Sequence, residues 1–365
     1  MKRNILLLAC LVLSIATFAQ ANSYYLTGRI IDGATQLPLQ AASVFAQNTT
    51  IGTVTDANGN FTLRLPIGGY DLAITFTGYE TISRRITTAD SYDKNIVIEM
   101  KQKEKAMEDV VIRASNEVLD GWEKYGSFFL DNFIGKSNNS KQCTITNSSV
   151  LKFYYYKRKD RLKVLATEPL EIENLALGYK IKYTLDSFIH DYKSQSGIYT
   201  GYPLFEEMTT TDSLQQITWQ NNRDKAYSGS ILHFMRSVYD KTLKEQGFEI
   251  QFIAKKDEKE RAIKLTDFYK SIGYKMDDSS AVVEITPYQA DIAILYTYNA
   301  PDPEYIDQNN EVARDFQLSV INIAPGNDIA IEQNGYYYDQ SDITITGYLA
   351  WHKIADMLPY NYNPW

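Results

Sequence analysis

Cysteine and histidine are both scarce in this sequence of 365 residues. There are 2 cysteines and 3 histidines, and the histidines stand at positions 190, 233 and 352. No histidine is followed by glutamate three positions later, and no His-Glu-x-x-His motif occurs, although zinc-dependent peptidases use these spacings. A phosphate-binding loop and a dinucleotide fingerprint are missing as well. The sequence therefore predicts no metal site and no other cofactor.

Positively charged residues are outnumbered, with 37 Lys and Arg against 45 Asp and Glu and a net charge of −8. The densest basic group, at residues 157–163, stands between two strand-like runs and is typical of a solvated hairpin tip. Nucleic-acid binding depends on a basic surface that displaces counterions from the phosphates. We therefore expect no nucleic-acid partner.

Long hydrophobic runs are absent except at the start of the chain. The basic pair "KR" precedes an apolar run over residues 5–18, and the small-x-small triplet "AQA" follows it. This arrangement is typical of an export signal, so we expect residues 1–21 to be removed and the mature chain to begin near Asn22. The run is shorter than a membrane-spanning helix requires. We expect no transmembrane span once the signal is removed.

Lipidation of Cys10 is an alternative, because "LLAC" at residues 7–10 resembles a lipobox. The apolar run before Cys10 is shorter than the hydrophobic region of a signal peptide, which argues against this alternative. In both cases we expect an exported protein that is periplasmic or associated with the outer membrane. Loss of the leader leaves Cys143 without a disulfide partner in the chain.

Residues 22–100 form a series of short apolar–polar alternations separated by turns. The stretches "FTLRL", "YDLAITF" and "NIVIEM" alternate with a period of two, and glycine, proline and an Asn-Gly pair stand between them. This pattern predicts a seven-stranded antiparallel β-sandwich. In "DANGN", residues 56–60, glycine is the fourth residue and the bidentate glutamate of a calcium loop is missing. We interpret the stretch as a hairpin turn.

The rest of the chain is expected to be a linker over residues 101–115 and a larger α+β domain over residues 116–365. Apolar residues recur every three or four positions over 117–134 and 222–246, which predicts two long helices that each end before a glycine. Asn116 is the candidate N-cap of the first helix. Strand-like runs such as "VLKFYYY" and "DIAILYTY" predict a mostly antiparallel sheet. The expected fold class is mainly β with α+β.

A family resemblance is carried by the stretch "GRIIDGATQLPLQAASVFAQNTTIGTVTDANGNFTLRLPIGGYDLAITFTGYE". It resembles the carboxypeptidase D regulatory-like domain of Bacteroidetes envelope proteins. The resemblance implies a transthyretin-like sandwich that has no catalytic residues of its own. The later stretches "ALGYKIKY", "YSGSILHFMRSV" and "GYLAWHKIADMLPY" are similar to the second half of a group of such proteins, for which the resemblance implies no activity.

The lead-in to the second predicted helix offers a candidate binding site. Arg223, Tyr227, His233 and Arg236 follow steps of three, four and six, so several of them can share one side of a helix and face a cleft. The alternative is a solvated helix face with one packed histidine. Two Ser-x-x-Lys matches, which end at Lys94 and Lys152, are short enough to arise by chance.

Residues 107–115, "MEDVVIRAS", are similar to the segment that follows the same sandwich in TonB-dependent receptors. The sequence that remains is too short for a plug and a transporter-class barrel, so we expect a linker strand. The leading hypothesis is a non-catalytic envelope protein that binds envelope proteins, peptide or glycan, or that acts in assembly. The alternatives are an envelope hydrolase with a site near His233 and an accessory partner of a TonB-dependent transporter.

Overall fold

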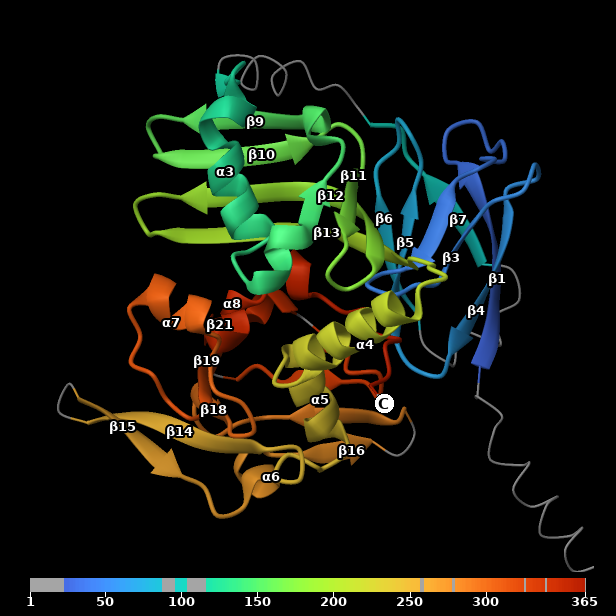
Figure 1. Cartoon of the computed structure of the whole chain (residues 1–365). Coiled ribbons are helices and arrows are strands. Elements are labelled where there is room, and N and C mark those ends of the chain that lie inside the picture. The colour runs from blue at the N-terminus through green and yellow to red at the C-terminus, as the bar shows by residue number, and fades with distance from the viewer. Residues whose placement is uncertain are drawn as a thin grey trace, which may run out of the picture.

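The computed structural model describes residues 23–86, 96–103, 116–256, 259–277, 280–324, 326–338 and 340–364. The expected signal with Cys10, the Ser-x-x-Lys match at Lys94 and the segment 107–115 lie outside these ranges. Figure 1 shows a blue sandwich beside a green sheet, a yellow-to-orange sheet below, and two yellow helices with the red C-terminal segment between these bodies. No helix among the described residues is long and apolar enough to cross a membrane.

The N-terminal body is a sandwich of two sheets, with strand orders β4-β1-β7 and β3-β2-β5-β6. Its strands are β1 (Ser23–Asp32), β2 (Ser43–Ala46), β3 (Gly52–Val54), β4 (Asn60–Pro66), β5 (Tyr70–Thr75), β6 (Ile82–Ile86) and β7 (Ile96–Met100). Alternate residues of β4 are buried, as the period of two predicts. The predicted antiparallel pairing needs one correction, because β7 runs parallel to β1. Strand β7 therefore lies beside β1 and in the other sheet from β6, the strand that precedes it in the sequence.

The turn predicted at residues 56–60 is present, but it is not a hairpin, because the strands on either side of it, β3 and β4, lie in different sheets of the sandwich. Gly59 has a φ of +76°, and an added Cβ there would meet the carbonyl oxygen of Ile30. One carboxylate oxygen of Asp56 accepts hydrogen bonds from the backbone N–H groups of Asn58 and Asn60, each at 2.8 Å. These bonds, together with the accommodating glycine, fix the direction in which the chain enters β4.

The second body is an antiparallel sheet of order β8-β11-β12-β10-β9, with β13 paired to β12. Its strands are β8 (Cys143–Ile145), β9 (Leu151–Tyr156), β10 (Arg161–Ala166), β11 (Leu170–Asn174), β12 (Tyr179–Asp191) and β13 (Ser196–Glu207). Helix α3 (Gly121–Phe133) lies across one face of this sheet, as Figure 1 shows. Phe129 and Phe133 are fully buried there and contact Phe188 and Tyr183 edge-on. This aromatic layer is the core of the second body.

Helix α3 starts later than predicted and stops where predicted. Glu117 forms a β-bridge with Tyr154 and so extends along β9, which leaves Asp120 rather than Asn116 as the N-cap. At the other end Gly135 has a φ of +106°, as expected of a residue that terminates a helix. The tertiary pairing of Glu117 overrides its helical periodicity.

The third body contains a five-stranded sheet, β15-β14-β18-β19-β21, and a three-stranded sheet, β16-β17-β20. The strands are β14 (Phe248–Lys256), β15 (Lys259–Lys264), β16 (Lys275–Asp277), β17 (Val282–Ile285), β18 (Asp291–Tyr296), β19 (Gln317–Ile323), β20 (Ile329–Ile331) and β21 (Ile343–Gly347). Short helices join them: α6 (Phe268–Ser271), α7 (Pro303–Asn309) and α8 (Tyr348–Trp351). The 3-10 turns of the chain include η3 (Asn138–Gln142), η4 (Ser148–Val150), η5 (Gln340–Asp342) and η6 (Ile354–Asp356).

The prediction of one helix over 222–246 is wrong, because the structure has two. Helix α4 (Ser213–Tyr227) is capped by Asp212, and α5 (Ile231–Tyr239) begins after Ser230. Gly229, between them, has a φ of +79°, which breaks the helix. The hydroxyl of Ser230 accepts a hydrogen bond from the N–H of His233 and caps the new helix. The apolar period runs across Ser230, so periodicity alone does not reveal the break.

The sandwich is joined to the other bodies by backbone hydrogen bonds from its loop at residues 47–50. The N–H of Asn48 donates to the carbonyl of Pro203 at 2.8 Å, and the N–H of Phe205 donates to Thr49 at 2.9 Å. The N–H of Tyr360 donates back to Asn48 at 2.7 Å. The loop thus adds to the edge of β13 and also holds the C-terminal segment.

A second contact surrounds Arg85, which projects from β6 of the sandwich. Its guanidinium lies 3.8 Å from the ring centre of Tyr338 and 5.0 Å from that of Tyr336. Its Nε lies 3.0 Å from a carboxylate oxygen of Asp71, and the Tyr336 hydroxyl donates to the same carboxylate at 2.6 Å. This ionic and aromatic contact connects the sandwich to the loop between β20 and η5.

Candidate functional site: a polar cleft between distant segments

The strongest candidate site is a hollow of about 360 Å³, which we call the polar cleft. Its walls come from η3, the end of α4, the loop after β18, the first residue of β19, and the segment from α8 to η6. The volume lies within the range of small-molecule sites. Larger open hollows occur elsewhere, but the polar cleft is where buried titratable side chains from these remote segments meet.

Asp356 forms one end of the polar cleft and is 6% exposed. Its Oδ1 accepts hydrogen bonds from the hydroxyl of Ser137 and from Nδ2 of Asn139, both at 2.9 Å. Its Oδ2 lies 3.4 Å from Nδ1 of His352, without hydrogen-bond alignment. Burial acts to raise the pKa of Asp356, but the contacts with His352, Ser137 and Asn139 outweigh it and lower the pKa below its usual value. Asp356 is therefore a carboxylate held in its charged form.

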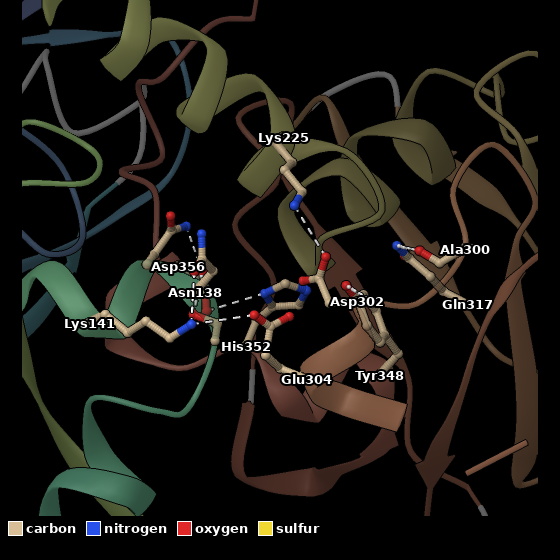
Figure 2. Close-up of polar contacts among 12 residues, drawn as sticks. Asn138, Lys141, Lys225, Ala300, Asp302, Glu304, Gln317, Tyr348, His352 and Asp356 are labelled. Atoms are coloured by element: carbon tan, nitrogen blue, oxygen red, sulfur yellow. Dashed lines mark hydrogen bonds and ion pairs between the residues drawn. The ribbon is translucent and has the colours of Figure 1, made fainter. Parts of the chain in front are cut away.

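Asp302 and Tyr348 form the middle of the polar cleft. The ammonium group of Lys225 lies 3.2 Å from a carboxylate oxygen of Asp302, and the N–H of Asp302 donates to the Tyr348 hydroxyl at 3.3 Å. The ring of Tyr348 meets that of His352 edge-on, with centroids 5.0 Å apart. Burial and the nearby Asp302 raise the pKa of Tyr348, so this phenol stays neutral. Figure 2 shows the imidazole of His352 between Asp356 on one side and Asp302 on the other.

Gln317 lines the polar cleft opposite Asp356. Its side-chain Nε2 donates to the carbonyl of Ala300 at 3.4 Å, and Figure 2 shows this pair apart from the His352 group. Its Oε1 is buried and has no hydrogen-bond partner among the described residues. A buried polar atom left unbonded costs about 1–3 kcal/mol, and this oxygen lies against Gly229, where an added Cβ would meet it at 2.5 Å.

The two arginines predicted for a binding site both donate hydrogen bonds to backbone carbonyls. Arg223 donates to the carbonyls of Leu177 at 2.7 Å and Gly178 at 3.1 Å, and its guanidinium lies 4.0 Å from the ring centre of Tyr179. Arg236 donates to three carbonyls, those of Asn334, Tyr360 and Tyr362, at 3.1, 2.9 and 2.9 Å. The two arginines hold different segments and do not converge on the polar cleft.

His233 and Tyr227, the other two predicted residues, stack on each other with ring centroids 4.6 Å apart. Nδ1 of His233 accepts from the N–H of Gly229 at 3.2 Å, and Nε2 lies 3.0 Å from Oε1 of Gln246. Burial lowers the pKa of His233, which favours the neutral ring. Both nitrogens of this histidine are engaged in packing the junction of α4 and α5.

Sequence inspection missed the polar cleft because its residues are spread from position 137 to position 356. One signal was present: His352 and Asp356 stand four residues apart. That spacing alone does not identify a site, and only the packing of η6 against η3 brings Ser137 and Asn139 to the same carboxylate. The remaining wall residues share no motif.

Comparison with known protein families identifies the sandwich. Residues 26–112 match the model of the CarboxypepD_reg-like domain. The chain carries a CarboxypepD_reg-like domain. Domains of this family are regulatory rather than catalytic. Among the described residues, no group of three or more His, Cys, Asp and Glu side chains is arranged to hold a metal ion.

Outside the CarboxypepD_reg-like domain, comparison adds little. No curated protein matches the chain. Two solved structures are similar over parts of it: a streptococcal ancillary pilin and a 9R-lipoxygenase from Cyanothece PCC8801. The pilin is 17% identical over 24% of this chain and 31% of its own, with a TM-score of 0.20. The lipoxygenase is 9% identical over 62% of this chain and 49% of its own, with a TM-score of 0.17. The chain thus spans less than half of either protein, and neither similarity carries an argument.

Proposed function

We propose that this protein is a non-catalytic, exported protein of the cell envelope that acts as a binding or assembly module and holds a small polar ligand in the polar cleft. The export signal pattern at residues 1–21 supports the location. Cell fractionation tests it: the protein should be recovered from the periplasm or outer membrane with an N-terminus near Asn22. Accumulation of the full-length chain in the cytosol would contradict it.

The order of groups around Asp356 is the observation that carries the binding role. In a hydrolytic triad the serine hydroxyl bonds to histidine, and the carboxylate orients that histidine from behind. In the polar cleft the hydroxyl of Ser137 donates to Asp356 itself, at 2.9 Å. Because this hydroxyl donates its proton to a carboxylate, it is not positioned to give that proton to His352 and so to act as a nucleophile. The arrangement holds a charge in place without forming a nucleophile–base pair.

The assembly part of the proposal is supported by the way the CarboxypepD_reg-like domain is attached. Its loop at residues 47–50 bonds both to β13 and to the C-terminal segment. Nδ2 of Asn361 in that segment donates to the hydroxyl of Thr50 at 2.7 Å. The sandwich is therefore fixed against the region that contains the polar cleft, as a domain that presents or supports a binding region must be.

The test is a binding screen on the purified protein with short peptides and oligosaccharides, read by ligand-detected NMR. Asn138→Trp places a bulky ring on an exposed residue that lines the polar cleft. It should weaken binding of any ligand found there at least about tenfold, which corresponds to about 1.4 kcal/mol. The control Asn221→Trp, at an exposed position of α4 outside the lining, should bind as the original protein does.

Two results would overturn the proposal. One is a screen in which no probe binds, or in which Asn138→Trp leaves every bound probe unaffected. The other is reproducible hydrolysis of a peptide, ester or glycan that is abolished by His352→Ala or His233→Ala. The second result would replace a binding role with the hydrolase alternative.

A further inference from the structure

We propose that the edge of β3 takes up an extended polypeptide segment of a partner protein as an added strand. The place is a hollow of about 520 Å³ between the sandwich and the sheet of the second body, which we call the junction groove. Thr50 and Gly52 line it from the sandwich, and residues of β11, β12 and β13 line it from the sheet. It shares no lining residue with the polar cleft, so this inference goes beyond the proposed ligand site and does not rest on it.

Strand β3 is an edge strand, because β2 is its only ladder partner in the part of the chain that the structure describes. The carbonyl of Ile51 accepts a hydrogen bond from the last residue of β2 at 3.0 Å, and the N–H of Thr55 donates to Ala42 at 2.9 Å. Backbone groups alternate in direction along an antiparallel strand, so those of Gly52 and Val54 point away from β2. The edge therefore presents two N–H donors and two carbonyl acceptors.

These four backbone groups are open to an incoming strand. Gly52 and Val54 are both exposed, and among the described residues only the hydroxyl of Thr53 approaches one of the four groups, at 3.5 Å from the carbonyl of Val54. Native edges are commonly protected by lysine, proline or a bulge. Strand β3 has no charge and no proline, and its register with β2 is unbroken. Donors and acceptors at this spacing are matched by another extended backbone, which identifies the occupant as a polypeptide.

A three-residue edge offers few hydrogen bonds, so the opposite wall has to contribute to binding. Five charged residues line the junction groove from the sheet, and each lies across from a residue of opposite charge: Glu171, Glu173, Lys180, Lys182 and Glu206. None of the five has an ion pair or a side-chain hydrogen bond within the described residues. Every second side chain of an added strand faces the same way, and polar or charged ones can pair here without breaking an internal contact.

The edge is held in position before any partner arrives. The loop at residues 47–50, which bonds to β13 and to the C-terminal segment, ends just before β3 begins. Leu204 of β13 packs close to β3, since a Cβ added to Gly52 would lie 3.2 Å from its side chain. The two sides of the junction groove therefore keep a fixed separation, which reduces the entropy lost when a segment binds.

The experiment uses the purified protein and a synthetic pool of acetylated octapeptide amides. Odd positions of the pool are Val or Thr, and even positions are Lys, Glu or Gln. A second pool is identical but methylated at every backbone nitrogen, so it keeps the side chains and loses the N–H donors. We expect the protein to bind the first pool about tenfold or more tightly than the second. Bound peptide should also slow amide hydrogen exchange in residues 51–55, measured by mass spectrometry.

Val54→Pro tests the edge directly, because it removes a donor that points away from β2 and leaves the ladder of the sandwich intact. It should weaken peptide binding about tenfold or more, with little change in the urea midpoint of unfolding. The control Val54→Thr keeps the N–H group and a β-branched side chain, and it should bind as the original protein does.

Lys182→Glu tests the opposite wall. The five charged lining residues change from three Glu and two Lys, a net −1, to four Glu and one Lys, a net −3. Captured peptides should therefore carry more Lys and less Glu than those captured by the original protein. The control Lys163→Glu, on β10 and outside the lining, should leave the composition of the captured peptides unchanged.

Several results would overturn the inference. The first is equal capture of the two pools, or capture of neither. The second is binding that a folded Val54→Pro variant leaves unchanged, or that Asn138→Trp weakens, because the peptide would then bind elsewhere. The third is protection of residues 51–55 by an oligosaccharide, or by a higher concentration of the protein alone, because the occupant would be a glycan or a second copy. If Val54→Pro does not fold, an unchanged peptide composition with Lys182→Glu contradicts the inference.

Discussion

The CarboxypepD_reg-like sandwich and the polar cleft use carboxylates in opposite ways. In the sandwich, Asp56 accepts hydrogen bonds from backbone N–H groups two and four residues away. In the polar cleft, Asp356 accepts from side chains 217 and 219 residues away. The pKa is lowered in both cases, but by a local turn in one and by the docking of distant segments in the other. A charged side chain in a turn organises its own loop, while one in the cleft depends on the whole fold.

The largest loss of stability is expected for Arg236→Ala, because Arg236 contacts segments that are distant in sequence. The substitution leaves the carbonyls of Asn334, Tyr360 and Tyr362 without their donor and releases the C-terminal segment that borders the polar cleft. Hydrogen bonds to a charged donor are worth about 1.5–3 kcal/mol each and do not add fully, so we expect the free energy of unfolding to fall by about 4 kcal/mol. Urea unfolding measures it.

The control is Arg314→Ala, whose guanidinium is partly exposed and lies 3.8 Å from Glu311 in a local pair. It should cost less than about 0.5 kcal/mol, as surface ion pairs do. If the two arginine variants lost equal stability, the distinction between local and long-range polar contacts would not hold for this chain.

The same distinction explains what could be predicted from the sequence. The period of two in β4, the Asn-Gly turn at residue 59 and the glycine stop at residue 135 all depend on neighbours within a few positions, and all are confirmed. The break between α4 and α5 is also local, at Gly229 and Ser230, although the apolar period does not show it. Two other errors occur where a remote segment decides. Glu117 is drawn out of α3 by its bridge to Tyr154, and β7 pairs parallel with β1 across the sandwich.

The candidate site depends on contacts between remote segments even more than the fold does. Arg223, Tyr227, His233 and Arg236 attracted attention because they are polar or aromatic and close in sequence. In the structure their polar groups are engaged with backbone carbonyls, neighbouring rings and Gln246. The polar cleft is made instead by residues whose partners lie far along the chain, and periodicity contains no information about such pairs.

A second test measures how the stability contributed by Asp356 depends on pH. Its folded pKa lies below the unfolded value of about 3.9, so its charged form contributes stability that is present above that pH and lost as the pH falls through the folded pKa. Asp356→Asn removes this charge, and we expect a loss of about 2 kcal/mol at pH 7. The difference between Asp356→Asn and the original protein should shrink as the pH is lowered below about 4. A constant difference from pH 7 to pH 3 would show that the charge does not matter.

The smallest effect is expected for Asp56→Asn in the sandwich. The amide oxygen of asparagine can still accept from the N–H groups of residues 58 and 60, so only the charge is lost. The charge of Asp56 faces solvent, where water and salt screen it. We expect the midpoint of urea unfolding to fall slightly at low salt, and we expect this difference to disappear at about 1 M salt.

The salt titration also makes the comparison between the two carboxylates quantitative. The loss caused by Asp356→Asn should persist at high salt, because its partners are buried with it and ions do not reach them. If Asp56→Asn and Asp356→Asn responded to salt in parallel, the polar cleft would be as open to solvent as the turn at residues 56–60. Its carboxylate would then be no better preorganised for a ligand than any surface aspartate, and the reason for locating the binding site there would be lost.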